Sequence, residues 1–191
     1  MADQTKTIAF LVAPEGTERV ELTEPWNAIE KAGHTAVLLS TAAGLVQTFD
    51  HLDKSTTQPV DKVVGDATVE EYDALVLPGG VANPDALRLN EAAVAFARDF
   101  LASGKPVAAI CHAPWTLVEA DVVRGRTLTS WPSLHTDITN AGGTWVDERV
   151  VVDGNLITSR KPDDLPAFIA ATLEAVDHGT DSAAAVAEQR G

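Results

Sequence analysis

Short apolar runs alternate with amphipathic segments along most of this chain, and this alternation constrains the fold more than any other feature. The runs at Thr7–Ala13, Asp73–Pro78 and Val107–Ile110 indicate buried strands. Apolar residues at helical spacing follow the first run, and they recur over residues 90–103 after the second. Strands that alternate with helices of this length predict βαβ crossovers and a mostly parallel sheet covered on both faces. We therefore expect an α/β fold, a flavodoxin-like three-layer α/β/α sandwich.

The first predicted helix ends at Gly33 and contains Pro25. Pro25 predicts a kink, because proline removes a backbone donor and crowds the preceding turn. Residues 41–70 are polar and irregular, and there we expect only a small strand pair around Gln47 and residues 59–64. Further elements are expected at residues 34–40, 127–129, 134–140, 150–154, 156–158 and 162–176.

Length and composition indicate one globular domain. The chain has 191 residues, of which 45% are hydrophobic, and this is enough for a sizeable core. No internal repeat or linker interrupts the sequence, so we expect a single domain over residues 1–178. The tail, residues 179–191, is rich in alanine and charge and is compatible with a helical extension or a frayed end.

Composition also bears on location and partners. The first residues lack a signal-peptide pattern, and no run reaches the roughly 18 apolar residues of a membrane span, so we expect a cytoplasmic protein. A single cysteine agrees with a reducing compartment. The formal net charge of −14, without a local basic patch, argues against nucleic acid and anionic membranes. The glycine patterns of phosphate-binding loops are absent, so we expect no flavin, dinucleotide or other cofactor.

The single cysteine, Cys111, directly follows the run Val107–Ile110 and precedes His112 and a helical pattern that opens with Pro114. A nucleophile at a sharp strand-to-helix turn is the arrangement of a nucleophile elbow. The helix N-terminus favours ionisation of a thiol there. Inert core packing is the common alternative for a lone cysteine. Because ligand sites of open α/β sheets lie at the carboxyl ends of strands, we expect Cys111 to be reactive.

A second strand end carries Gly79 and Gly80. Neighbouring parallel strands open on the same side, so the backbone N–H of Gly80 and that of His112 are candidates for an oxyanion hole beside the sulfur. The alternative is a tight turn with no chemical role.

Two acidic residues follow the first strand on the same side of the sheet. Glu18 and Glu21 are three positions apart and share one face of the first helical turn. Acidic side chains there also suit the helix dipole without further function. The functional alternative is that a buried Glu21 beside a thiolate keeps its proton, donates a hydrogen bond to sulfur, and cradles an oxidised sulfenate or sulfinate.

His112 is the candidate base or ion-pair partner of Cys111, provided that a carboxylate orients its other ring nitrogen. Asp85, in the loop that we expect after Gly80, is the candidate orienting acid. The alternative is that a histidine stands next to the cysteine by chance.

Other polar groups and the tryptophans are weaker candidates. Asp50, His51 and Asp53 resemble a solvated loop more than a metal site, so no metal is expected. Arg160 is placed either to bind a substrate anion or to form a salt bridge with Asp163 or Asp164. Tryptophans are more often core residues than site walls, but any that line the site would make it small and apolar: Trp26, Trp115 and Trp131.

Together these residues resemble the DJ-1/PfpI superfamily, and its PfpI branch most closely. The similarity spans nearly the whole chain. It is carried by Glu18–Glu21 with Pro25, Asp73–Gly80, Arg88–Glu91, Gly104–Pro114, Asn140–Gly142 and Thr158–Phe168.

The resemblance implies a flavodoxin-like sandwich, a homo-oligomer built on a dimer, and Cys111 as nucleophile. It also implies that Glu21 contacts the sulfur, that Gly80 and His112 offer backbone amides, and that Asp85 of a neighbouring subunit completes a Cys-His-acid triad. Two positions depart from the family pattern. Ala113 stands where glycine is usual, and Asp85 is shorter than the glutamate of some members.

The resemblance further implies a stress-response cysteine hydrolase or lyase that acts on small carbonyl compounds or glycated adducts, as a deglycase, a glyoxalase III-like enzyme or a peptidase. The alternative is an oxidative-stress sensor or holdase chaperone, in which Cys111 cycles to sulfenic or sulfinic acid. A ligand-binding flavodoxin-like domain is a third interpretation. The sequence leaves open the physiological substrate and any assembly beyond a dimer.

Overall fold

A seven-stranded sheet forms the centre of the molecule, in the order β11-β12-β8-β7-β1-β3-β6. The computed structural model describes residues 5–190. Neighbouring strands are parallel, apart from the antiparallel pair β11 and β12, which confirms the mostly parallel sheet. The strands are β1 (Thr7–Val12), β3 (Thr35–Ser40), β6 (Lys62–Val63), β7 (Ala74–Leu77), β8 (Val107–Ile110), β11 (Val150–Asp153) and β12 (Leu156–Ser159).

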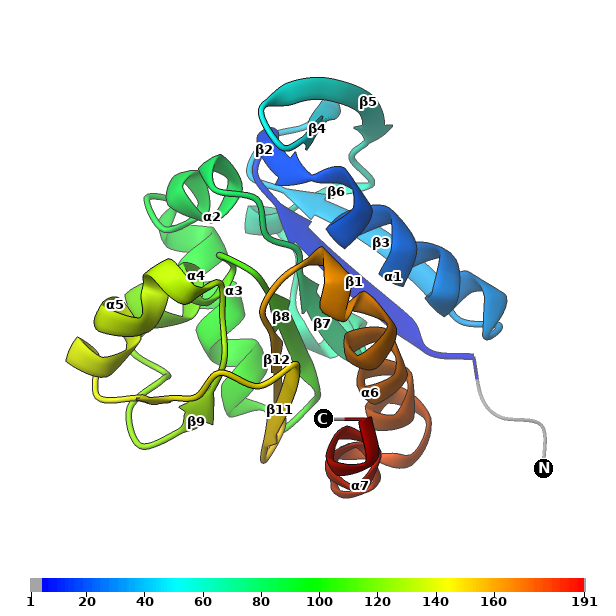
Figure 1. Cartoon of the computed structure of the whole chain (residues 1–191). Helices are drawn as coiled ribbons and strands as arrows, with labels where there is room; N and C mark the ends of the chain where they lie inside the picture. Colours follow the sequence, from blue (N-terminus) through cyan, green and yellow to red (C-terminus); the bar gives the residue numbers. More distant parts are fainter. Residues whose placement is uncertain (1–4, 191) are drawn as a thin grey trace.

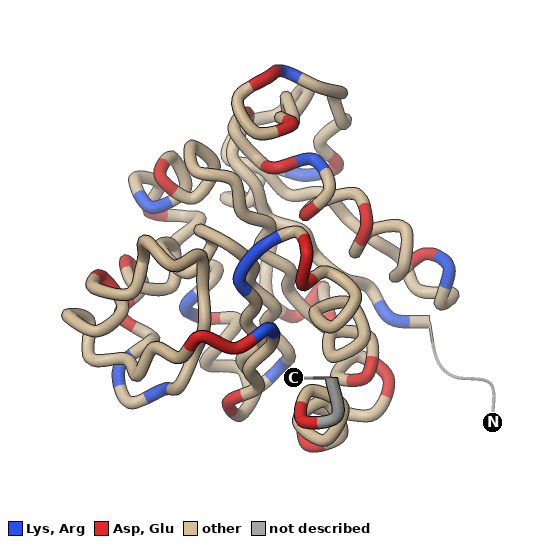
Figure 2. Tube along the Cα trace, in the orientation of Figure 1, with Lys and Arg blue, Asp and Glu red and all other residues tan. Residues whose placement is uncertain are grey.

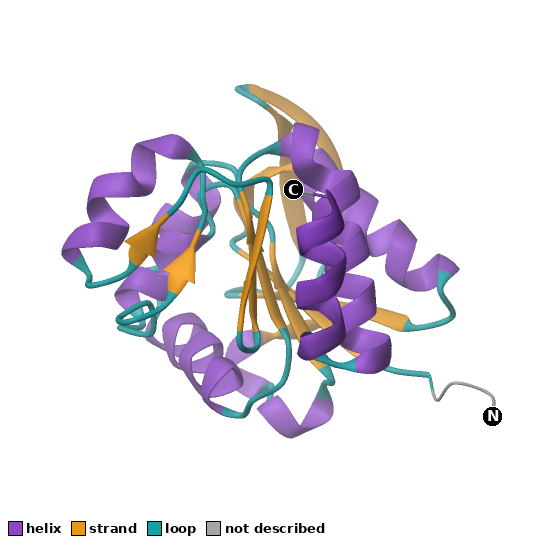
Figure 3. Ribbon diagram, turned by 60° about the horizontal axis from the view of Figure 1, so that its bottom comes forward, coloured by secondary structure: helices purple, strands orange, loops and turns teal. Residues whose placement is uncertain are grey.

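Helices cover both faces of this sheet and complete the expected three-layer sandwich (Figure 1). Seen after a turn of 60°, the sheet stands between two helical layers (Figure 3). One layer contains α1 (Arg19–Lys31), α6 (Leu165–His178) and α7 (Thr180–Arg190). The other contains α2 (Ala82–Leu87), α3 (Glu91–Ala102), α4 (Pro114–Glu119) and α5 (His135–Asn140). Short 3-10 helices occupy residues 64–66, 69–71, 132–134 and 162–164.

Each face of the sheet has its own hydrophobic core, because successive side chains of a strand point to opposite faces. In β1, Phe10 packs in the core beneath α1 and α6, and Leu11 packs in the core beneath α3 and α4. Both side chains are fully buried. Two-sided burial explains why the central strands are continuous apolar runs rather than alternating ones.

Helix α1 runs through Pro25 and ends near the predicted position. Gly33 follows it with φ of +92°, a left-handed conformation that suits glycine after a helix. The predicted kink at Pro25 stays a prediction.

Residues 41–70 are more regular than predicted. They supply β4 (Leu45–Asp50) and β5 (Asp53–Pro59), an antiparallel hairpin that contains Gln47 as expected. The second strand of the hairpin, β5, comes earlier in the sequence than the predicted strand at residues 59–64. Within that predicted range, β6 pairs with β3 at the edge of the main sheet. The hairpin pairs with a strand that the sequence did not reveal, β2 (Glu15–Glu18). The polar composition of β5 fits an exposed edge strand, which apolar patterning does not detect.

The segment after Gly80 corrects the expected loop, because it forms the short helix α2. Asn83 fixes its start. The Asn83 side chain donates to the carbonyl oxygens of Pro78 and Gly79 at 2.8 and 3.0 Å and accepts from the N–H of Ala13 at 2.7 Å. Pro84 lies in the first turn, where a missing N–H leaves no intrahelical bond unmade.

The remaining elements lie at the periphery. Two short strands, β9 (Thr127–Leu128) and β10 (Thr144–Trp145), form a separate parallel pair. In the tail, α7 packs against α6 and β11, with Ala183 and Ala187 buried. Within residues 5–190, each helix is too short or too polar to cross a membrane.

Candidate active site

Cys111 lies at a strained turn between β8 and α4. Its φ is +64°, which is uncommon for a residue other than glycine. Two backbone hydrogen bonds fix this turn: the Cys111 N–H donates to the carbonyl of Ser159 at 3.0 Å, and its carbonyl accepts from Trp131 at 2.8 Å. The sulfur is therefore held at the carboxyl end of the sheet, as a nucleophile elbow requires.

Gly79 occupies the equivalent position beyond β7. Leu77 pairs with Ala109 in the sheet. Gly79 and Cys111 each follow two residues after this pair, so they lie side by side. A Cβ atom at Gly79 would lie 2.5 Å from Glu21 Oε2 and 2.6 Å from Cys111 Cβ. Only glycine therefore allows the carboxyl group and the cysteine to approach this closely.

Glu21, in the first turn of α1, is fully buried beside the sulfur. Its Oε2 accepts a hydrogen bond from the Gly79 N–H at 3.0 Å, and its carboxyl group contacts the Cys111 thiol. Within the described residues, Oε1 forms no hydrogen bond. Burial raises the pKa of Glu21 to about 8, against the opposing effect of the thiol contact. Glu21 therefore holds its proton at neutral pH, in the direction that the sequence predicts.

The thiol departs from the predicted behaviour. Burial raises the pKa of Cys111, the charge of the Glu21 carboxylate raises it further, and the N–H groups of Gly80 and His112 lower it. The side chain is 6% exposed and α4 has only six residues, so desolvation outweighs the helix terminus. Because Glu21 and Cys111 touch, they titrate as a pair that accepts one negative charge and resists a second.

His112 contacts the sulfur directly, with Nδ1 3.1 Å from Sγ. Its ring stacks on Trp131 at 5.6 Å between centroids and lies tilted against Trp115 at 5.3 Å. Burial lowers the pKa of His112 to about 4, so the ring is neutral at physiological pH. A neutral imidazole at this distance can accept the thiol proton.

The other predicted site residues lie farther from the sulfur or do not contact it. Asp85 is exposed on α2 and forms no contact with His112 within the described chain. Its role depends on a second subunit and stays a prediction. Glu18 accepts a hydrogen bond from the His51 N–H at 3.0 Å. Ala113 has φ of −53°, an ordinary helical value, so the backbone does not need glycine there.

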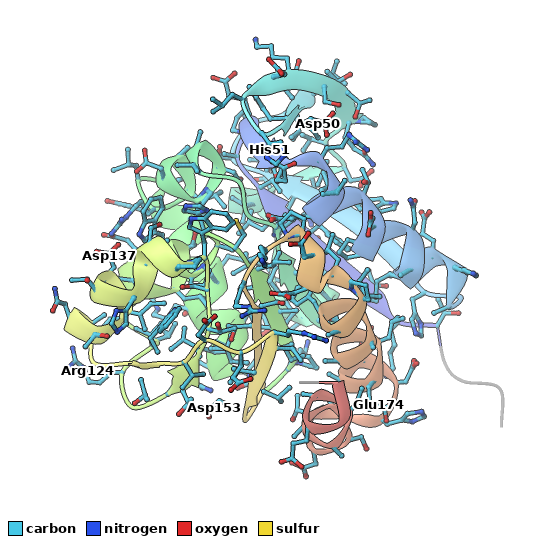
Figure 4. All side chains as sticks on the ribbon, viewed as in Figure 1. Asp50, His51, Arg124, Asp137, Asp153 and Glu174 are labelled. Atoms are coloured by element: carbon cyan, nitrogen blue, oxygen red, sulfur yellow. The ribbon has the colours of Figure 1, made fainter. Side chains whose placement is uncertain are left out.

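A cavity of about 560 Å³ opens above Cys111. The sequence did not reveal its upper wall, which the hairpin supplies through Phe49, His51 and Leu52. Figure 4 shows Asp50 and His51 at the hairpin turn, beside the start of α1. The sequence signal that could have revealed this wall is Leu52, an apolar residue within a polar turn. In the structure its side chain is 93% exposed. Trp131 also lines the cavity and forms an aromatic wall. The sequence did not decide whether this residue belongs to the core or to the site.

The remaining candidates have structural partners. Arg160 binds Asp164 at 2.8 Å, one of the two expected acids, and also Asp147 at 2.7 Å. Trp26 packs against the ring of Phe10 in the core. Residues 5–190 contain no group of three or more His, Cys, Asp or Glu side chains placed to hold a metal ion.

Comparisons with known proteins agree with this architecture. Residues 6–175 match the DJ-1/PfpI family. The chain is 46% identical over 165 residues to "Protein/nucleic acid deglycase 2" of Escherichia coli, covering 86% of this chain and 94% of that protein. It is also 46% identical over 162 residues to "Deglycase PH1704" of Pyrococcus horikoshii, covering 85% and 94%.

A solved structure from Anabaena variabilis, a two-domain protein with DJ-1/ThiJ/PfpI-like and ferritin-like domains, superimposes with a TM-score of 0.86 and 35% identity. The match covers 93% of this chain but half of that longer protein. The match to the family extends from β1 into α6, so it includes every strand of the main sheet. It also includes the ends of β7 and β8, where Gly79 and Cys111 lie. This chain therefore belongs to the DJ-1/PfpI family.

Proposed function

We propose that this protein is a cysteine-dependent hydrolase of the deglycase type, which acts on small carbonyl compounds or glycated adducts. The observation that carries the proposal is the contact of Cys111 Sγ with His112 Nδ1 at 3.1 Å, beside a buried carboxyl group and two backbone N–H groups. The names of the E. coli and P. horikoshii relatives support this class.

The first step is addition of sulfur to a carbonyl carbon. The S–C bond forms as the thiol proton moves to His112 Nδ1, and the π electrons of the C=O bond move to oxygen. The N–H groups of Gly80 and His112 then stabilise the oxyanion. This path starts from a neutral thiol and a neutral imidazole, the forms that burial favours.

Glu21 adjusts the charge on sulfur. A protonated carboxyl group donates a hydrogen bond to a thiolate, and Oε1 is the oxygen free to carry that proton. An ionised Glu21 would repel the thiolate instead. The proton on Glu21 thus stabilises the charged nucleophile without adding a second negative charge.

The proposed active unit is a homodimer in which Asp85 orients His112 of the other subunit. Two observations support an interface near Asp85: the ring of His112 lacks a carboxylate partner within the described chain, and apolar side chains flank α2 on the surface. Val81 is 57% exposed and Leu89 83% exposed. An interface there would bury both side chains and carry Asp85 toward the second site.

A second candidate function is an oxidative-stress sensor. The unpartnered Oε1 of Glu21 and the two amides would hydrogen-bond the oxygens of a sulfenate or sulfinate on Cys111. With one cysteine in the chain, reduction would require an external thiol. Stress response and cytoplasmic location belong to this proposal as well.

Turnover of the methylglyoxal adducts of cysteine and lysine tests the enzyme proposal. We expect wild-type turnover and its loss in Cys111→Ser, with Cys111→Ala as a second variant because serine retains a weak nucleophile. Equal rates in the wild type and both variants would contradict an enzymatic role. Mass spectrometry after mild peroxide tests the sensor: a thiol that stays reduced would contradict it.

A further inference from the structure

The cavity above Cys111 has an acidic lining. Glu15, Glu18 and Glu21 line it, and the described lining includes no lysine or arginine. His51 and His112 are the lining residues able to carry positive charge, and burial lowers the pKa of His112 to about 4. Even with His51 protonated, Glu15 and Glu18 leave the mouth with net negative charge.

Three cations near this mouth have acidic partners, and a fourth, Lys54, lies opposite Phe49 in the hairpin but outside the cavity lining. Arg19 binds Asp50 at 2.8 Å. Arg160 binds two aspartates, and Lys161 binds Asp163 at 3.2 Å. Figure 2 shows the same pattern, with the basic segment before α6 directly adjoining an acidic one. Because the whole chain has a net charge of −14, no distant excess of cations offsets the acidic mouth.

The floor of the cavity carries an independent sign of a ligand. Glu21 is fully buried, lines the cavity, and has an oxygen without a hydrogen-bond partner in the described residues. A buried polar atom without a partner is costly, so a polar group of a bound ligand gains a hydrogen bond there while Cys111 is a neutral thiol. The walls above it are apolar, with Phe49, Leu52 and Trp131 among the lining residues.

We propose that this cavity selects carbonyl adducts that carry a positive charge near the reacting carbon and disfavours adducts that carry phosphate or carboxylate. This substrate class rests on the proposed function. Glu15 and Glu18 contact the cationic group at the mouth, the apolar walls hold the carbon skeleton, and the carbonyl carbon reaches Cys111. An adduct on a nucleotide would bring its phosphate toward two glutamates, and Asp85 of the proposed second subunit would add a third acidic group.

Charged thiol reagents test the preference without requiring turnover. Methanethiosulfonates form a mixed disulfide with Cys111 and release methanesulfinate, and Cys111 is the only site of reaction. We compare a trimethylammonium-ethyl with a sulfonatoethyl reagent, each normalised to its rate with free 2-mercaptoethanol. The normalised ratio should favour the cation on the order of tenfold at low salt and shrink as salt screens the charges.

The double variant Glu15→Gln with Glu18→Gln should move this ratio toward unity. Glu30→Gln, an exposed glutamate of α1 outside the cavity, should not change it. A wild-type ratio of one or below, or a ratio that the double variant leaves unchanged, would overturn the proposal. So would a thiol that neither reagent reaches, because the cavity would then admit no ligand of either charge.

Turnover separates this inference from the proposed function. The substrates are methylglyoxal hemithioacetals of thiocholine, 2-mercaptoethanol and 2-mercaptoethanesulfonate, which share one reacting centre and differ in charge. We expect kcat/KM to fall in that order. Equal kcat/KM for all three would overturn the charge preference and leave the function standing. A reagent preference without turnover of any adduct would contradict the function alone.

Discussion

The floor and the upper wall of the cavity are built in different ways. The floor consists of buried groups at adjacent strand ends: Cys111, Glu21 and Gly79. The upper wall comes from the β4–β5 hairpin, where His51 and Leu52 are exposed. The parallel sheet dictates the position of the floor, whereas the hairpin attaches to it through the short strand β2. The proposed chemistry therefore depends on the central sheet, and the proposed substrate selection depends on a peripheral part of the fold.

The largest effect should come from the buried proton of Glu21. Its pKa is about 8 in the folded state and near 4.5 when exposed, so folding binds a proton that the unfolded chain releases. Stability from this group is full below about pH 4.5 and is lost as pH rises toward 8. The total is on the order of 5 kcal/mol.

Denaturant unfolding of the wild type and Glu21→Gln between pH 4.5 and 8 measures this loss. The wild type should lose stability relative to Glu21→Gln across the window. Parallel curves for the two proteins would show that the floor holds no buried proton.

Gly79→Ala tests the close packing of the floor. Its Cβ would overlap Glu21 and Cys111, so we expect a loss of about 3 kcal/mol in the free energy of unfolding. Gly65→Ala is the matched control, because a Cβ there meets nothing within 4 Å. Similar unfolding midpoints for the two variants would contradict a tightly packed floor.

Asn83→Ala removes the side chain that fixes the start of α2. Three backbone groups lose their partner in a fully buried position, and we expect a loss of about 2 kcal/mol. The exposed Asn27→Ala should stay within about 0.5 kcal/mol of the wild type. Chemical denaturation measures the free energy of unfolding of both variants. Equal values would contradict a structural role for Asn83 beneath the cavity.

Leu52→Ser should have the smallest effect, and it probes the upper wall. Leu52 is 93% exposed and lines the cavity, so its loss should raise KM a few-fold, on the order of 0.5–1 kcal/mol, without lowering stability. Leu45→Ser, on the same hairpin but outside the cavity, is the control. Equal KM values for the two variants would remove the hairpin from substrate binding.

The sequence predicted the floor better than the upper wall. Apolar runs located β1, β7 and β8, and the equal direction of parallel strands then brought Gly79, Cys111 and Glu21 together. The hairpin was predicted only in part, because β5 is a polar edge strand whose pairing depends on a tertiary contact with β2.

The sequence also could not predict the direction in which the pKa of Cys111 is shifted. A helix N-terminus is visible in a sequence pattern, but the degree of burial is not. The raised pKa of Cys111 follows from packing around it, and one of the two N–H groups that lower it, that of Gly80, comes from another strand end. The contact between Asp85 and a second subunit lies beyond a single chain and stays a prediction.

The pH dependence of alkylation at Cys111 tests the central claim, that sulfur and Glu21 titrate as one coupled pair in the floor of the cavity. Iodoacetamide is neutral, and Cys111 is its only thiol target. Since burial raises the pKa of Glu21 to about 8, we expect the alkylation rate to rise as the pair loses its first proton through about pH 8. In Glu21→Gln this rise should shift, because glutamine has no carboxyl group that can ionise beside the sulfur. A profile identical in the wild type and Glu21→Gln would contradict the claim.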